Sequence, residues 1–260
     1  EQAHRELGSP MPNRSRIAVL FASDGFAPQA IAEQLPGGII PFGCSSGAVI
    51  AAGQTHLDSI SAVLLDLPSD SFRMGCFARH SDSAFTLGQR MGRWAHSCFA
   101  KPAAILFVAG VQLNGDELLA GFFEHTGPIS LTGAYAANGD FSFDNIWVLG
   151  NEGIVEEGAH LLVFDESQLP IETIALSGWS RIGTRKIVTR SEGSTVFEID
   201  GQPALDIYQR YFRLHEREDD SLYTELYNEY PIQLIRDDGT TASRVVIGVD
   251  HQRRCLTYTG

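Results

Sequence analysis

Short, uninterrupted apolar runs that lead into glycine-rich turns limit the folds open to this chain. The segments Arg16–Ser23 and Ala103–Val108 each carry such a run, which is typical of a buried strand. Glycine-rich turns follow apolar segments at Gly43–Gly47, Gly110–Gly115 and Gly133–Gly139. Because ligands of α/β proteins bind beyond the carboxyl ends of strands, we expect these turns to line one pocket. The alternative is that the glycines only serve tight turns.

Helical spacing appears between the apolar runs, so the sequence predicts a mixed α/β (α+β) fold of layered sheets with helices. The predicted helices are Pro28–Leu35, Asp82–Cys98, Asp116–Phe123 and Ala204–Leu214. Further strands are expected at Ile39–Phe42, Ser59–Leu65, Ile129–Leu131, Ile146–Leu149, Ala159–Phe164, Ile171–Leu176, Lys186–Thr189, Thr195–Ile199, Arg244–Val249 and Cys255–Thr259. After about residue 165 helices become rare, which predicts a more β-rich C-terminal region.

Net charge and cysteine content narrow the class of protein. The chain has 260 residues and a formal net charge of −13, which disfavours binding to nucleic acids and to anionic membranes. The four cysteines form no C-x-x-C pair, and free thiols indicate a reducing compartment. No apolar run reaches the roughly 18–20 residues of a membrane-spanning helix. We therefore expect a soluble, cytoplasmic protein. The N-terminus reads as the end of a helix entered midway, which suggests a fragment.

The turn Gly43-Cys44-Ser45-Ser46-Gly47 is the strongest candidate for chemistry. It matches G-x-S-x-G after a strand, and Ala48–Ala52 has a helix-like composition, as in the nucleophile turn of a serine hydrolase. Ser45 would be the nucleophile, with His215 or His251 as its base. Cys44 is an alternative reactive thiol. The structural interpretation, which we favour, is a small-residue turn that lets a backbone approach closely.

Metal and haem sites have weaker signals. The pairs Cys76/His80 and His96/Cys98 lack the knuckle spacing of a structural zinc site, so we predict no metal site. A haem would need an axial ligand, for which the candidates are His80, His96, His125 and His160. No complete catalytic set emerges, and we expect a protein that is not an enzyme.

Six segments in this order resemble motifs of the FIST domain family (F-box and intracellular signal transduction proteins). They are Val19–Ser23, Gly43–Gly47 (G-C-S-S-x-G, one residue shorter), Phe107–Val111 with Asn114 and Glu117, Thr132–Ala136 (G-G-x-A), Ser177–Gly183 (H-G-W-x-P-x-G) and Phe197–Tyr208 (E-x-x-G-x-P-A-L-x-x-Y). Each motif is weak alone, but their order is specific. The family's usual histidine before Gly-Trp is Ser177 here, which puts any role of that histidine in doubt.

The resemblance implies a sensory module that binds a small ligand, such as an amino acid, and signals to a histidine kinase or a cyclic-dinucleotide enzyme. One subgroup of the family binds haem and senses nitric oxide, which is an alternative here. The implied regions are an N-terminal tail or helix end (1–15), a FIST N-terminal region (16–201) and a truncated FIST C-terminal region (202–260). The expected ligand-binding residues are Gly43, Cys44, Ser45, Ser46, Gly47, Gly110, Asn114, Gly133, Ala134 and Trp179.

Two packing expectations concern the C-terminal part. Trp179 is either a wall of the ligand pocket or a core indole, and we favour the core position. Leu205, Tyr208 and Phe212 recur at helical spacing, so we expect them to share one buried face. This helix should pack against the N-terminal region and, by the resemblance, relay ligand binding to a partner.

Overall fold

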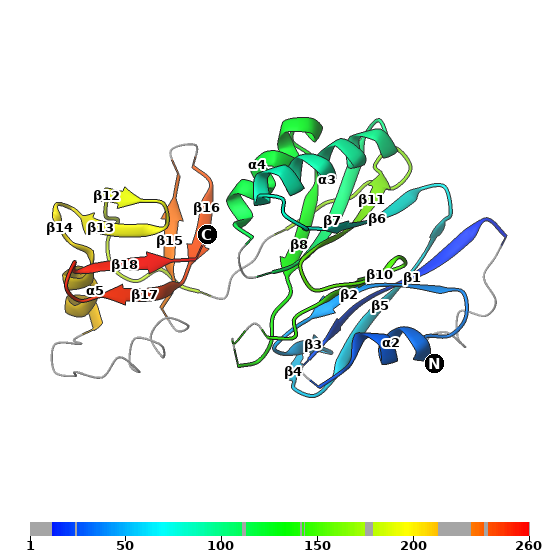
Figure 1. The fold of residues 1–260 in the computed structure, drawn as a ribbon, viewed down its shortest axis with the longest axis horizontal. Coiled ribbons are helices and arrows are strands. Elements are labelled where there is room, and N and C mark those ends of the chain that lie inside the picture. Colours follow the sequence, from blue (N-terminus) through cyan, green and yellow to red (C-terminus); the bar gives the residue numbers. More distant parts are fainter. Residues whose placement is uncertain are drawn as a thin grey trace. The chain divides into compact units, whose positions relative to one another are not determined.

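The computed structural model describes residues 12–23, 25–110, 113–140, 142, 144–174, 179–212, 230–236 and 239–259. Within these residues it contains four helices and 18 strands, which confirms the predicted mixed α+β fold (Figure 1). The chain divides into two compact units, Glu1–Leu176 and Ser177–Gly260. The predicted N-terminal helix end and the predicted charged loop His215–Asp220 fall mostly or wholly outside the described residues.

The first unit is built on two sheets. Sheet I has the strand order β10 (Gly153–Val155), β9 (Val148–Gly150), β2 (Ile39–Ser45), β1 (Arg14–Ala22) and β5 (Ile60–Pro68). Sheet II has the order β6 (Phe72–Ala78), β11 (Gly158–Asp165), β7 (Pro102–Ala109) and β8 (Leu131–Tyr135). A separate short hairpin joins β3 (Val49–Ala51) to β4 (Gln54–His56). The pairs β1–β2 and β7–β8 are parallel, and the other pairs in the two sheets are antiparallel.

The two sheets pack face to face, with one core between them. Phe42 of β2 stacks on Phe107 of β7 with ring centroids 4.9 Å apart, and Phe21 of β1 meets the same ring edge-on at 5.3 Å. A helix pair, α3 (Ala84–Cys98) and α4 (Gly115–Thr126), covers the outer face of sheet II, and α2 (Pro28–Gln34) covers part of sheet I. The first unit therefore has four layers (Figure 1).

Local sequence signals explain where these helices begin. Pro28 opens α2, where its missing N–H is harmless. The Ser83 hydroxyl accepts a hydrogen bond from Thr86 N–H at the start of α3, and Asn114 Oδ1 accepts one from Glu117 N–H at the start of α4. The three helices predicted in this region are thus confirmed. Leu87 and Met91 are fully buried on α3, as their spacing predicts.

Three predictions from local composition were wrong. Residues 48–52 contain strand β3 instead of a helix, because the chain folds back at once to pair β3 with β4. The strand expected at Ile129–Leu131 begins only at Leu131 and runs to Tyr135, where pairing with β7 holds it. No strand forms at 171–174; instead Leu169 and Ile171 pack against the core between the sheets.

The second unit has a smaller sheet and one described helix. Sheet III has the order β12 (Val188–Glu192), β13 (Thr195–Ile199), β18 (Cys255–Tyr258) and β17 (Val246–Asp250), with β14 (Gln202–Pro203) paired to β13. A hairpin joins β15 (Ile232–Ile235) to β16 (Thr241–Arg244).

The helix of this unit, α5 (Ala204–Phe212), packs on β13 and β18. Leu205 and Tyr208 are buried, and Phe212 packs against the same cluster, which confirms their shared face. Strand β13 lies within the N-terminal region (16–201) that was expected from the sequence, but it belongs to the second compact unit, as α5 does. Among the described helices of the whole chain, none is long and apolar enough to cross a membrane.

Candidate functional site

The turn after β2 and the segment after β8 meet at one edge of the first unit. Ala137 N–H donates to the Ser45 carbonyl oxygen at 3.1 Å. A Cβ atom placed on Gly47 would lie 2.9 Å from the Asn138 carbonyl oxygen, so only glycine lets these two backbones approach so closely. Both segments leave the carboxyl ends of parallel strands.

The loop after β7 reaches the same edge. Leu113 N–H donates to the Gly110 carbonyl oxygen at 3.3 Å, and the Tyr135 hydroxyl donates to the Leu113 carbonyl oxygen at 2.9 Å. The structure therefore brings together the three segments that the sequence singled out. We call this place the carboxyl edge, and its described members are Ser45–Gly47, Gly110, Leu113, Asn114 and Gly133–Gly139.

The polar groups of the turn after β2 are largely engaged within the fold. Ser45 N–H donates to the Trp147 carbonyl oxygen at 3.0 Å, and the Trp147 N–H returns a bond to Ser45 Oγ at 3.1 Å. Ser46 N–H donates to the Ala22 carbonyl oxygen at 2.8 Å, and its hydroxyl donates to the Ala48 carbonyl oxygen at 2.6 Å. The turn is thus a junction of three chain segments, and its two serine N–H groups are not available to an anion.

The first two residues of the motif have packing roles. A Cβ on Gly43 would lie 2.2 Å from the Leu20 carbonyl oxygen, so β1 and β2 approach too closely there for a side chain. Cys44 points into the core between the sheets, and burial raises the pKa of its thiol to about 12. A thiol with that pKa holds almost no thiolate at neutral pH, which is the reactive form. Ser45 ends a strand that is followed by strand β3, whereas a hydrolase nucleophile turn leads into a helix.

The remaining predicted residues occupy different kinds of position. Gly133 and Ala134 lie within strand β8 and are exposed, so the turn predicted from the sequence at these residues was wrong. Asn114 caps α4 with its side chain, as described above. Trp179 belongs to the second unit and is 56% exposed, so the expectation that it is a core residue was wrong.

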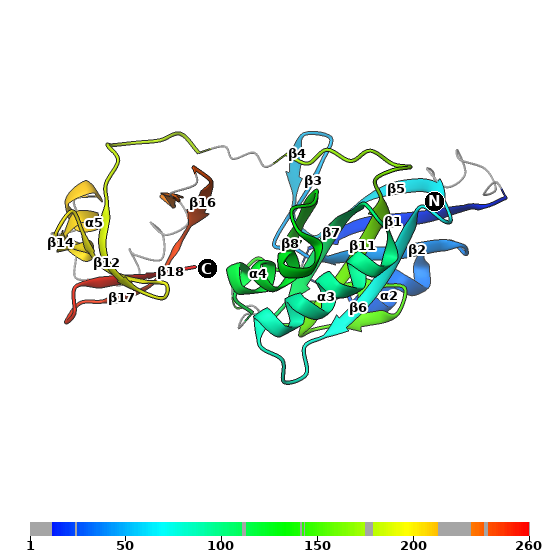
Figure 2. The ribbon, with the colours of Figure 1, turned by 90° about the horizontal axis from the view of Figure 1, so that it is seen from above.

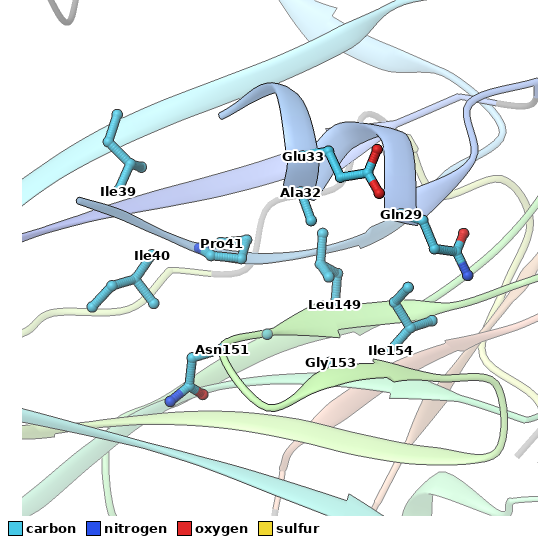
Figure 3. Close-up of a pocket in the computed structure, with 11 residues that line it drawn as sticks. Gln29, Ala32, Glu33, Ile39, Ile40, Pro41, Leu149, Asn151, Gly153 and Ile154 are labelled. Atoms are coloured by element: carbon cyan, nitrogen blue, oxygen red, sulfur yellow. The ribbon is translucent and has the colours of Figure 1, made fainter. Parts of the chain in front are cut away.

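Sequence reasoning missed an open groove beside α2. It has a volume of about 480 Å³ and lies between α2, the start of β2 and the β9–β10 hairpin. Figure 3 shows Leu149 and Ile154 pointing toward α2, while Gln29 and Glu33 project from that helix. Its residues come from segments more than 100 positions apart, and no local pattern marks them as neighbours. None of the ten predicted ligand residues lines this groove.

His160 is a buried side chain whose role the structure explains. Its Nε2 lies 3.0 Å from the Gly153 carbonyl oxygen, and its Nδ1 would lie 2.4 Å from a Cβ on Gly150. The ring therefore connects β11 of sheet II to the β9–β10 hairpin of sheet I. Burial lowers the pKa of His160, and the bond to Gly153 opposes this effect.

His160, one of the four candidate haem ligands, is already engaged within the fold, and none of the four lines the groove beside α2. Coordination by His160 Nε2 would break its bond to Gly153. His80 and His96 are exposed, and His125 lies 3.5 Å from the Arg93 guanidinium. No group of three or more metal-ligating side chains occurs among the described residues.

Comparison with known families gives one result that covers most of the chain. The sequence model of the FIST N domain matches residues 16–202, and so includes the carboxyl edge, the groove and the start of the second unit. No curated protein matches the chain. FIST domains are sensory domains of signal transduction. Because the match spans well over half of its length, this chain belongs to the FIST N domain family.

Proposed function

We propose that this domain binds a small polar metabolite, such as an amino acid, at the carboxyl edge and signals to a histidine kinase or a cyclic-dinucleotide enzyme. One observation supports this location above others: the segments after β2, β7 and β8 converge there, at the carboxyl ends of two parallel pairs. Open α/β sheets bind ligands at such edges. The domain acts by binding, in a reducing cytoplasm, and not by catalysis.

The engaged N–H groups of Ser45 and Ser46 restrict how the ligand is held. Contacts must come from side chains and from the exposed part of β8, where Gly133 and Ala134 lie and where Tyr135 is 43% exposed. The junction at Ser45 then serves as a rigid support for these contacts. A site that is rigid before binding loses less conformational entropy when the ligand binds.

A thermal-shift screen of the twenty amino acids tests the site with a matched pair of variants. Ala134→Glu places a carboxylate at the exposed end of β8, whereas Thr132→Glu places it two residues earlier on the same face. A ligand at 100 times its Kd stabilises the wild type by about 2.7 kcal/mol. We expect Ala134→Glu to abolish this gain and Thr132→Glu to retain it. Equal stabilisation of both variants, with loss in Glu33→Gln, would move the site to the groove beside α2.

Signalling is tested separately by hydrogen exchange at α5. If the helix relays binding, the exchange protection of Leu205–Phe212 changes when the ligand identified by the screen is added. Unchanged protection at α5, together with normal ligand binding, would mean that α5 is only a scaffold. That result would contradict the signalling proposal but not the proposed binding site.

A further inference from the structure

The strand β5 is an unusually open sheet edge. It is the last strand of sheet I, is nine residues long, and pairs with β1 without a bulge. The opposite edge strand of sheet I, β10, has only three residues. Natural proteins usually protect long edge strands with charges, prolines or bulges. Residues Ile60–Leu65 carry none of these, although the chain as a whole has a net charge of −13.

Hydrogen bonds at its two ends fix which backbone groups of β5 face outward. Ser23 N–H donates to the Ser59 carbonyl oxygen, and Ser69 N–H donates to the Asn13 carbonyl oxygen. Odd-numbered residues of β5 therefore bond to β1, because antiparallel pairs alternate. Ile60, Ala62 and Leu64 turn their N–H and C=O groups to the open side, where no described residue bonds to them.

The second half of the edge is closed by a side chain. Arg14 donates to the Asp66 carbonyl oxygen, which is the next outward group, and also to the Asp66 carboxylate. Arg16 pairs with the same carboxylate at 3.2 Å. Pairing with another strand is thus confined to residues 60–64.

Exposed apolar side chains surround this open half. Ile60 and Val63 of β5 are 41% and 61% exposed, and Ile50 and Leu57 of the neighbouring hairpin are 73% and 69% exposed. Ser61 Oγ donates to the Ile50 carbonyl oxygen at 3.2 Å, so the hairpin stands directly beside β5 (Figure 2). Ile60 and Val63 point to opposite faces of the sheet, so a strand added to this edge would meet apolar side chains on both faces.

We infer that two copies of this chain dimerise by antiparallel pairing of their β5 strands about a two-fold axis at Ala62. In this register Ala62 faces Ala62 and Ile60 faces Leu64, so all three outward residues of each strand find partners. The paired stretch is uncharged and identical on both sides, as a two-fold interface requires. Ile50 contacts Ser61, one residue from the axis, which brings Ile50 of both copies to the interface. The five strands of sheet I then become ten.

Sedimentation equilibrium of the full chain tests the dimer. The wild type should show a reversible monomer–dimer equilibrium that strengthens with salt, because salt screens the repulsion between two acidic copies. Ala62→Pro removes an outward N–H that the monomer does not use, and edge strands tolerate such a proline. We expect its dimer Kd to rise at least about tenfold, while Ala62→Ser leaves Kd unchanged. A wild type that stays monomeric at every concentration overturns the inference, as does a dimer indifferent to Ala62→Pro.

A crosslink gives a second readout that does not depend on the proline variant folding. Cα atoms of hydrogen-bonded antiparallel partners lie about 5.5 Å apart, which suits a disulfide. Ala62→Cys should therefore form a disulfide-linked dimer on mild oxidation, whereas Ser97→Cys, exposed on α3, should not. Equal crosslinking of both variants would show random collision and would contradict the proposed register.

Discussion

At the scale of single residues, the motif Gly43–Gly47 is explained by close approach and internal hydrogen bonding. Gly43 faces the Leu20 backbone, and Gly47 faces Asn138. Ser45 bonds to Trp147 through two atoms. These requirements select the same small residues that a nucleophile turn would, and a short motif alone does not distinguish the two.

Gly43→Ala should destabilise the first unit by about 1–3 kcal/mol, because its Cβ would lie 2.2 Å from the Leu20 carbonyl oxygen. Gly37→Ala is the matched control, since a Cβ there meets nothing within 4 Å. Urea denaturation, monitored by the fluorescence of buried Trp147, measures the free energy of unfolding of both variants. Equal midpoints for the two variants would refute this packing role.

His160 should make the first unit less stable in mild acid. Its pKa in the folded state is lowered below the usual 6.5, so the unfolded chain takes up a proton first as the pH falls. The stabilisation is complete above about pH 6.5 and is lost progressively below it. His160→Gln retains a donor for Gly153 and removes the titration. The His160→Gln variant should lose less stability between pH 7 and pH 5 than the wild type or the exposed-site control His96→Gln. Equal losses in all three proteins would contradict the proposed effect of His160 titration.

At the scale of elements, the helix pair α3–α4 is held at short range by glycines. A Cβ on Gly88 would lie 2.0 Å from the Leu118 carbonyl oxygen, and one on Gly92 would lie 2.2 Å from that of Phe122. A Cβ on Gly121 of α4 would lie 2.1 Å from the Phe85 carbonyl oxygen of α3. The two backbones are therefore almost in contact, and there is no room for a methyl group.

Gly92→Ala should lower the thermal midpoint, although alanine is favoured over glycine in a helix by about 1 kcal/mol. The steric cost of separating α3 from α4 exceeds that gain. Ser97→Ala, at an exposed position of α3, also raises helix propensity but causes no clash, and it should not lower the midpoint. A midpoint that rises in Gly92→Ala would mean that the helices move apart at little cost.

Local patterns predicted the elements whose signal lies within one segment. Helices α2 to α5 and strands β1, β5 and β7 have apolar runs or spacing that need no distant partner to be recognised. Strand β6 was missed because Arg73 interrupts it and its burial alternates irregularly. The convergence of the glycine turns was predicted. The engagement of Ser45 was not, because its partner Trp147 lies 102 residues away and only the sheet register brings it there.

At the scale of the whole molecule, the two units have separate hydrophobic cores. Leu161 is fully buried with α3 and α4 in the first unit, and Leu256 is fully buried with α5 in the second. Leu161→Ala should cost about 2–5 kcal/mol and should speed hydrogen exchange of the slowest amides in the first unit only. Leu256→Ala should do the same in the second unit. A loss of protection throughout the chain from either variant would show one cooperative unit.

The position of β11 has a consequence for the order in which the chain folds. Residues Gly158–Asp165 enter between β6 and β7, which lie 49 or more positions earlier in the chain and do not pair with each other. Sheet I likewise cannot be completed before β9 and β10 have been synthesised. Neither sheet can be completed on a ribosome until almost the whole first unit has emerged, and such high contact order predicts slow folding. Until then the unpaired strands are exposed to misassociation, so nascent chains stopped before residue 158 should depend on chaperones.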